Sequence, residues 1–404
     1  MSDETETTDE PAAEKNRSSL RTLLIALVPF VLLGGLVGVI VSTGGGLAHL
    51  SGPPVQKLHF KRVNLPEPGT IEVRVVNDGP EPVKIAQVMV DEAYWQFEAS
   101  PSSVLEPRQS AVITIPYHWV ETEAHEITLL TDIGATFSEE IPVATEDPER
   151  NLELFGRFGL VGFYVGILPI ALGLLWFPFL SRLSRRVMNG VLSLTVGLLV
   201  YLAVGTWLDA LEFAHEIAEF WQGTSMVVAI TALVLGGLLM TGQLGGGRDS
   251  QSPLRIAYLI ALGIGLHNFG EGLAIGAAYA GGEAALGAYL ILGFTLHNVT
   301  EGIGIAAPVA DRRPALKHFV LFVLVAGAPA VVGTWIGGFA FDPVLGTVFL
   351  AAGVGAILQV VWEVGRLVKQ NSEAIGESMI SAGNLVGFAL GLGLMFTTGY
   401  FVAL

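Results

Sequence analysis

One short polar motif occurs twice in an otherwise apolar part of the chain. The first copy lies in LHNFGEGLAIG at 266–276 and the second in LHNVTEGIGIAAP at 296–308, so the pattern H-N-x-x-E-G repeats after 30 residues. A histidine and a glutamate four residues apart lie on one face of a helix. Imidazole nitrogen and carboxylate oxygen together suit Zn²⁺ and also Fe²⁺, Mn²⁺ or Co²⁺. The candidate metal ligands are His267, Asn268, Glu271, His297, Asn298 and Glu301.

The spacing of the two copies predicts that they meet inside a helical hairpin. Gly281-Gly282-Glu283 offers a turn between them. Each motif then stands about 21 Å along a helix from that turn, near the middle of a membrane. A single His-Glu pair often only bonds its neighbours. Two copies in one hairpin favour a shared metal site, in which two carboxylates neutralise a divalent ion.

Three weaker candidate ligands lie on other apolar segments. Glu363 follows Gln359 by four residues and could be a ligand on the inner side of the membrane, or could mark the interface beside Arg366. Asp209 and His215 belong to a group that could attract cations at an outer mouth, although a solvated helix end explains it equally well. That group comprises Asp209, Glu212, His215, Glu216 and Glu219.

The composition places these residues in a membrane protein. Of 404 residues, 51% are hydrophobic and only 14% are charged, against about 25% charged in soluble proteins. The chain has no cysteine, so disulfides and thiolate ligands are excluded and a metal site must use nitrogen and oxygen. The formal net charge of −16 argues against nucleic acid as a partner and is typical of a halophilic, archaeal source.

The N-terminal part predicts a tail and a membrane anchor. Residues 1–21 are polar and acidic, which favours disorder. Residues 22–43 are apolar for long enough to span a bilayer and follow Lys15, Arg17 and Arg21, so the N-terminus should stay cytoplasmic. A cleaved signal peptide is the competing interpretation, which the length of the run and the lack of a clear A-x-A site disfavour.

Residues 55–148 are rich in β-branched residues and turn signals, unlike the rest of the chain. The runs read as strands are 71–77, 83–90, 94–99, 110–117 and 125–131. About seven short strands over this length predict a small immunoglobulin-like β-sandwich, which should lie outside the cell, after the anchor. Its histidines, His59, His118 and His125, are expected to be surface residues.

Eight apolar segments follow, which predicts an all-α polytopic bundle over residues 155–404. The segments are 155–179, 188–212, 222–244, 255–281, 284–309, 316–339, 345–368 and 381–403. Arginine and lysine occur in every second break, as the positive-inside rule requires when the first segment runs inward. The anchor also delivers the β domain outside, so two arguments agree on a multi-pass protein of the cell membrane with a cytoplasmic N-terminus.

The paired motif resembles that of the ZIP (Zrt-/Irt-like) metal transporters, in particular the bacterial and archaeal type. That family carries tandem H-N-x-P-E-G motifs on the fourth and fifth of eight helices, and the likeness covers residues 155–404. It implies that the motif residues form the transport site, that metal moves into the cytosol, and that the two motif helices move elevator-fashion. Gly270 and Thr300 replace the usual prolines, and 326–333 lacks the glutamate that serves a second metal in many relatives, which favours one principal ion.

The sequence therefore predicts a transporter of divalent transition metals, with Zn²⁺ foremost and Fe²⁺, Mn²⁺, Co²⁺ or Cd²⁺ as other cargoes. We expect no enzyme activity and no cofactor, because we find no further base or nucleophile motif. The alternatives are a membrane-embedded metalloenzyme that activates water at the same ligands and a metal sensor whose β domain binds a partner. The lipid bilayer and the metal ion are the expected partners, and a homodimer stays open.

Overall fold

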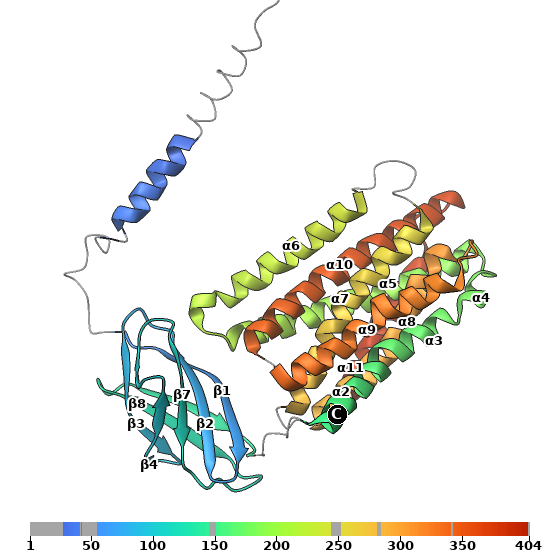
Figure 1. The fold of residues 1–404 in the computed structure, drawn as a ribbon. Helices are drawn as coiled ribbons and strands as arrows, with labels where there is room; N and C mark the ends of the chain where they lie inside the picture. The colour runs from blue at the N-terminus through green and yellow to red at the C-terminus, as the bar shows by residue number, and fades with distance from the viewer. Residues whose placement is uncertain are drawn as a thin grey trace, which may run out of the picture. The chain divides into compact units, whose positions relative to one another are not determined.

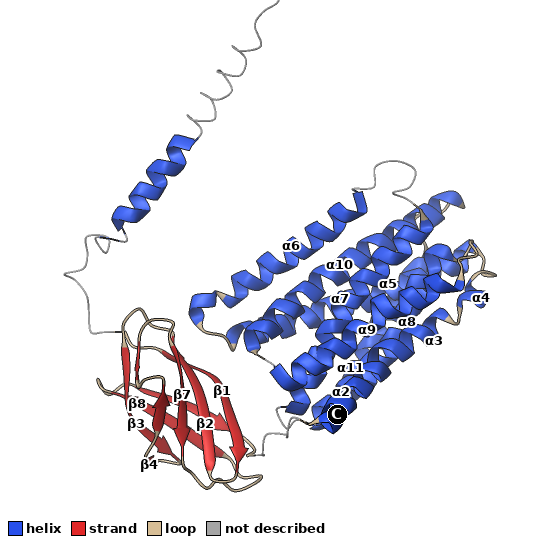
Figure 2. Ribbon diagram, in the orientation of Figure 1, coloured by secondary structure: helices blue, strands red, loops and turns tan. Residues whose placement is uncertain are grey.

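The computed structural model describes residues 27–40, 42, 55–144, 151–243, 252–280, 284–340 and 342–402. Strands and helices separate along the described chain, with all strands between residues 58 and 141 (Figure 2). The chain divides into two compact units, Met1–Val55 and Gln56–Leu404. In the first unit, an apolar helix over Leu27–Ile40 falls within the predicted anchor. The predicted tail 1–21 lies outside the described residues.

The strand region forms two antiparallel sheets around one hydrophobic core. Its strands are β1 (Leu58–Glu67), β2 (Thr70–Asn77), β3 (Val83–Val90), β4 (Ala93–Trp95), β5 (Glu98–Ser100), β6 (Val104–Leu105), β7 (Ser110–Ile115), β8 (His125–Thr131) and β9 (Thr136–Ile141). The sheet orders are β1-β2-β7-β5 and β4-β3-β8-β9, and β6 pairs with β3. Immunoglobulin sandwiches have the order A-B-E-D in one sheet and C-F-G in the other, which this arrangement matches with one added strand beside C. Val73, Ile113 and Leu129 are among the residues fully buried in the shared core.

The run 94–99, predicted as a single strand, is two strands on different sheets. β4 pairs with β3 and β5 pairs with β7, so the chain crosses between the sheets at Gln96-Phe97. Tyr94 and Trp95 favour a strand by residue type, but both are exposed, without the inward and outward alternation of a half-buried strand. β1, β6 and β9 had no predicted counterpart.

His125 is buried, which corrects the expectation of a surface histidine. Its Nε2 accepts the Val120 N–H, so Nδ1 carries the proton and donates it to Asp91 Oδ2 at 2.8 Å. Tyr117 O–H donates to the same oxygen at 2.7 Å, and the Glu126 N–H donates to Asp91 Oδ1 at 3.0 Å. Burial opposes the charge on Asp91, but these hydrogen bonds outweigh it and lower the pKa of the carboxyl. The network joins the β3–β4 turn to β8.

The helical region contains eight apolar passages. The first comprises α2 (Leu152–Gly162), a π-helical turn (Phe163–Ile167), α3 (Leu168–Leu174) and α4 (Phe177–Leu180). The others are α5 (Arg185–His215), α6 (Gly223–Gln243), α7 (Pro253–Ala280), α8 (Ala284–Ala306), α9 (Leu316–Ala340), α10 (Pro343–Ala374) and α11 (Ala382–Val402). Seven passages are long and apolar enough to cross a membrane within the described residues, and α11 counts as a shorter apolar helix over Ala382–Thr397. The helices indicate a multi-pass membrane protein, as predicted.

The helices pack in two groups. One contains α2, α3, α7, α8 and α9, the other contains α5, α6, α10 and α11, and the groups meet mainly where α7 packs on α10 (Figure 1). Glycine allows close approach within the first group. A Cβ at Gly272 of α7 would collide with the Ala330 carbonyl of α9, and a Cβ at Gly173 of α3 would collide with the Val299 carbonyl of α8. The chain ends at the end of the bundle where α2 begins (Figure 1), as an even number of passages requires.

The connection between α5 and α6 contacts the strand region. The Asp78 carboxylate accepts the N–H groups of Glu219 at 2.7 Å and Phe220 at 3.1 Å. Lys57 Nζ pairs with the Glu219 carboxylate at 2.5 Å, and the Arg108 guanidinium lies 5.7 Å from the centre of the Phe220 ring. Asp78 therefore caps the short 3-10 turn that precedes α6.

Candidate metal centre

The helices α7 and α8 present their His-Glu pairs to each other. His267 Nε2–H donates to Glu271 Oε1 at 2.9 Å, and His297 Nε2–H donates to the same oxygen at 2.7 Å. The relative exposures are only 2% for His267, 3% for Glu271 and 5% for His297, so these polar groups are shielded from solvent. One carboxylate oxygen thus links the two imidazoles across the helix interface.

Glu301 faces the same imidazoles but has no hydrogen-bond partner. One ligand atom from each of His267, His297 and Glu301 can be chosen so that all three lie within 4.8 Å of one another. Glu301 is buried, and neither of its carboxylate oxygens has a partner. A buried, unpaired carboxylate is unfavourable unless a cation or a proton neutralises it. Two imidazoles and an unpartnered carboxylate could together hold a divalent metal ion.

The two motif asparagines bond to the backbone of neighbouring helices. Asn268 Nδ2 donates to the Ala326 carbonyl of α9 at 3.0 Å. Asn298 Nδ2 donates to the Val165 carbonyl at 2.9 Å and to Glu271 Oε2 at 3.2 Å. Val165 lies in the π-helical turn, where the hydrogen-bond register changes and carbonyls leave their α-helical partners. These bonds hold α7 and α8 in place, while the buried Oδ1 atoms of both asparagines have no partner.

A cavity of about 100 Å³ opens beside the cluster. Its wall includes Thr206 and Asp209 of α5, His267 and Glu271 of α7, and Gly353 of α10. Asp209, a weak candidate from the sequence, is exposed and shares this cavity with two motif residues. An additional carboxylate therefore stands where a cation would approach the cluster.

The rest of the group at the end of α5 lies apart from the cavity. His215 is exposed at the last residue of α5 and does not line the cavity. Glu219 pairs with Lys57. The structure therefore brings Asp209 to the candidate site and leaves His215 outside it.

Polar groups continue on α10, on the side that faces α7. A Cβ at Gly263 would stand 2.9 Å from Gln359 Oε1, so Gln359 packs one helical turn before His267 along α7. Gln359 is fully buried, and neither its amide nitrogen nor its oxygen has a partner. Glu363, one turn further along α10, is also buried and lies 3.5 Å from Arg366 Nη1.

The structure brings together the histidines and glutamates that the sequence predicted, but other features were missed. Gln359 was noted only as a neighbour of Glu363, although an amide within an apolar helix is itself a signal. The replacements of proline leave both helices unbroken, and Thr300 Oγ1 donates to the His297 carbonyl at 2.6 Å. The predicted turn 281–283 lies outside the described residues, but the helices on either side of it are in contact.

No protein-family model matches the chain, and no curated protein matches it.

Proposed function

We propose that this protein carries divalent transition-metal ions across the membrane into the cytosol, with Zn²⁺ as the foremost cargo. The observation that carries this proposal is the Glu301 carboxylate, which is buried and unpartnered beside His267 and His297. The resemblance of the paired motif to that of ZIP transporters supports the same assignment.

The charges of the centre suit a divalent cation. Glu271 and Glu301 together balance two positive charges, and an ion inside a low-dielectric bundle is tolerated only when its charge is compensated. His267 and His297 add nitrogen ligands, and the chain has no thiolate that would favour a softer ion. These donors also accept Fe²⁺, Mn²⁺, Co²⁺ or Cd²⁺, so the cargo must be determined by experiment.

Protons and a metal ion would compete for the ligands of the centre. Nε2–H of each histidine donates a hydrogen bond to Glu271, so a metal ion would bind Nδ1 of the neutral imidazole or, after a change of tautomer, Nε2. A protonated imidazole or carboxyl group cannot bind the ion in this way. Acid conditions therefore oppose metal binding, and uptake should depend on pH.

The surroundings of the centre provide polar groups on both sides. Asp209 lines the cavity beside His267 and Glu271, while Gln359 and Glu363 lie toward the end of the bundle where α7 begins. The motif helices belong to one helix group and α10 to the other. Movement of the first group along α10 would carry a bound ion from the cavity toward Gln359.

Metal uptake into proteoliposomes tests the proposal. Zn²⁺, Mn²⁺, Fe²⁺, Co²⁺ and Cd²⁺ would be offered in parallel to wild type, His267→Ala, Glu301→Ala and the control Glu373→Ala, whose side chain is exposed on α10. We expect saturable uptake by wild type and control, and its loss in both variants of the centre.

Tight metal binding without flux in correctly oriented wild-type protein would contradict transport. The metalloenzyme and sensor alternatives would then come first. Deletion of residues 52–150 would separate a transporter from a sensor. A sensor should lose its response to metal, whereas a transporter should keep at least partial uptake.

A further inference from the structure

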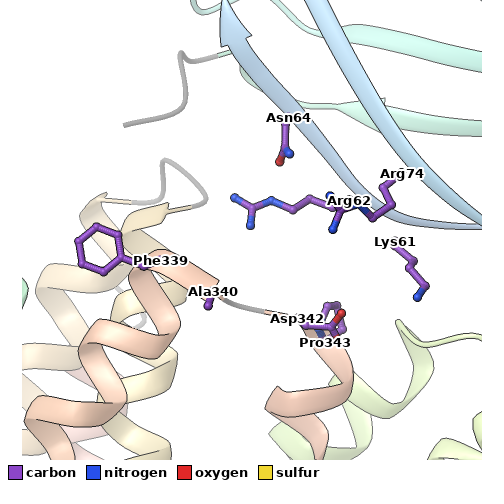
Figure 3. A pocket seen from close by; sticks show the side chains of 8 residues that line it. All are labelled: Lys61, Arg62, Asn64, Arg74, Phe339, Ala340, Asp342 and Pro343. Carbon is purple, nitrogen blue, oxygen red and sulfur yellow. The ribbon is translucent and has the colours of Figure 1, made fainter. Parts of the chain in front are cut away.

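We propose that a basic pocket beside the strand region binds the phosphate-bearing headgroup of a membrane lipid. The pocket has a volume of about 380 Å³ and is lined by Lys61, Arg62 and Arg74 on the strand side. Figure 3 shows Phe339, Asp342 and Pro343 on its helix side, where Asp342 Oδ1 caps α10 by accepting the Val344 N–H at 2.8 Å. This site is separate from the metal centre and does not depend on the transport proposal.

The distribution of charge makes this pocket exceptional within its domain. Residues 55–144 contain fourteen acidic and only six basic side chains. The basic residues are Lys57, Lys61, Arg62, Arg74, Lys84 and Arg108. Three of the six line one pocket, although the domain as a whole is acidic. An anionic ligand would therefore be attracted here and repelled by most of the remaining surface.

The three basic residues of the pocket outnumber its single carboxylate, that of Asp342, and form no ion pair with it. Arg62 and Arg74 are directly paired across β1 and β2, and like charges in that position destabilise a sheet. The ion pairs formed by the described residues include none with Lys61, Arg62 or Arg74. An anion held between the two guanidinium groups would remove this repulsion, and guanidinium matches phosphate with paired hydrogen bonds.

The position of the pocket identifies a lipid as the source of the phosphate. Its helix side is formed where α9 ends at Ala340 and α10 begins at Pro343. Both helices are long and apolar enough to span a bilayer, so their adjoining ends mark the level of the lipid headgroups. Phe339 supplies an apolar surface for the first carbons of the lipid's acyl chains. The buried Asn64 Oδ1, which has no partner, can accept a hydrogen bond from a headgroup hydroxyl.

Native mass spectrometry of the delipidated full-length protein tests the assignment. The probes are phosphatidylglycerol, a digalactosyl lipid without phosphate, and inorganic phosphate. Arg62→Gln/Arg74→Gln is compared with Lys84→Gln/Arg108→Gln, which removes the same two charges from the same domain, and circular dichroism verifies that both variants keep their fold.

We expect phosphatidylglycerol to bind wild type and the control pair, and to bind the Arg62/Arg74 variant roughly tenfold or more weakly. The galactolipid should not compete. Equal binding to both variants would overturn the proposal, as would equal binding of the two lipids. Variant-sensitive binding of inorganic phosphate without binding of phosphatidylglycerol would also overturn it, because the pocket would then serve a free anion.

Discussion

The two glutamates of the repeated motif occupy opposite environments although both follow the pattern H-N-x-x-E-G. Glu271 accepts hydrogen bonds from His267, His297 and Asn298, whereas neither oxygen of Glu301 has a partner. The difference arises because Nε2 of both imidazoles lies within hydrogen-bond distance of Glu271 and not of Glu301. One carboxylate therefore links the two helices, and the other is left without a hydrogen bond.

Gln359 gives the sharpest prediction at the scale of a single residue. Replacement by leucine removes a buried amide without partners, so the free energy of unfolding should rise by about 1–3 kcal/mol. The same change removes a polar group between the metal centre and Glu363, so the uptake rate should fall about tenfold, equivalent to ~1.4 kcal/mol in the barrier. Thermal unfolding in detergent and proteoliposome uptake measure the two effects.

Gln370→Leu is the matched control, since it makes the same change at an exposed position of the same helix. It should leave uptake unchanged. A lower melting temperature for Gln359→Leu would show that the amide is bonded within the protein. A higher melting temperature with normal uptake would exclude Gln359 from the pathway.

The chemistry-bearing residues on one helix could be predicted, but their partners on other helices could not. The four-residue spacing placed His267 with Glu271 and His297 with Glu301, because local helix geometry decides that relation. The approach of Asp209 and Gln359 to α7 depends on how three helices pack. Nothing in the spacing of residues along one helix encodes such a contact.

At the scale of elements, the turn between β3 and β4 depends on one carboxylate. Asp91 and Glu92 have positive φ angles of 51° and 63°, as a two-residue hairpin turn with the strands' right-handed twist requires. Asp91 joins this turn to Tyr117, His125 and the backbone of Glu126. Burial, followed by the hydrogen bond to Asp91 and its negative charge, raises the pKa of Tyr117 to about 12.

This network predicts a defined pH dependence for the strand region. The raised pKa of Tyr117 means that its contribution to stability is complete below pH about 10 and is lost as the pH rises toward 12. The lowered pKa of Asp91 has the opposite sign, so its contribution is present above pH about 4 and is lost in acid.

Asp91→Asn should lower the pKa of Tyr117, which would stay above its ordinary value because burial remains the largest cause. Each protein is titrated by ultraviolet absorbance, and the curve of its Tyr117→Phe counterpart is subtracted. The difference isolates the titration of Tyr117, and Tyr94→Phe is the control for the subtraction. An unchanged Tyr117 midpoint in Asp91→Asn would contradict the coupling.

Element positions were predictable where hydrophobic pattern alone decides them. β3 and β8 have the predicted bounds, and the eight apolar segments from 155 onward are mainly helical where the structure describes them, although the first is divided into several helical elements. The hydrophobic pattern did not predict β1, which has few buried residues, or β9, which has none. It also could not show that the chain changes sheets at Gln96-Phe97, because that depends on the pairing of distant strands.

At the scale of the whole molecule, an even number of passages puts the start of α2 and the C-terminus at one end of the bundle (Figure 1). The α4–α5 connection then belongs to the opposite end from the α5–α6 connection. Arg182, Arg185 and Arg186 lie at the former, as the positive-inside rule predicts for a cytoplasmic loop.

Thiol labelling can test this sidedness directly, since the chain has no cysteine of its own. A membrane-impermeant maleimide should label Gln222→Cys in intact cells and Ser181→Cys only after permeabilisation. Both residues are exposed and lie in connections between helices, so the access of the maleimide to them depends on the side of the membrane. The reverse labelling pattern would show that the bundle has the opposite orientation.

Charge distribution predicts sidedness, but it does not predict which helices pack together. α7 carries apolar or small residues over most of its length and is extensively buried, so its sequence shows no single preferred face. The two helix groups and the basic pocket at the α9–α10 connection are therefore tertiary properties that only the structure reveals.

Glu271 already accepts hydrogen bonds from both imidazoles and from Asn298. Once a cargo ion has left, three of the four ionisable groups of the proposed site satisfy one another. Only Glu301 still requires compensation, and a single proton can supply it. If the protein transports metal as proposed, the empty site can return without a second metal ion travelling outward. The arrangement would then favour net uptake of metal over obligatory one-for-one exchange.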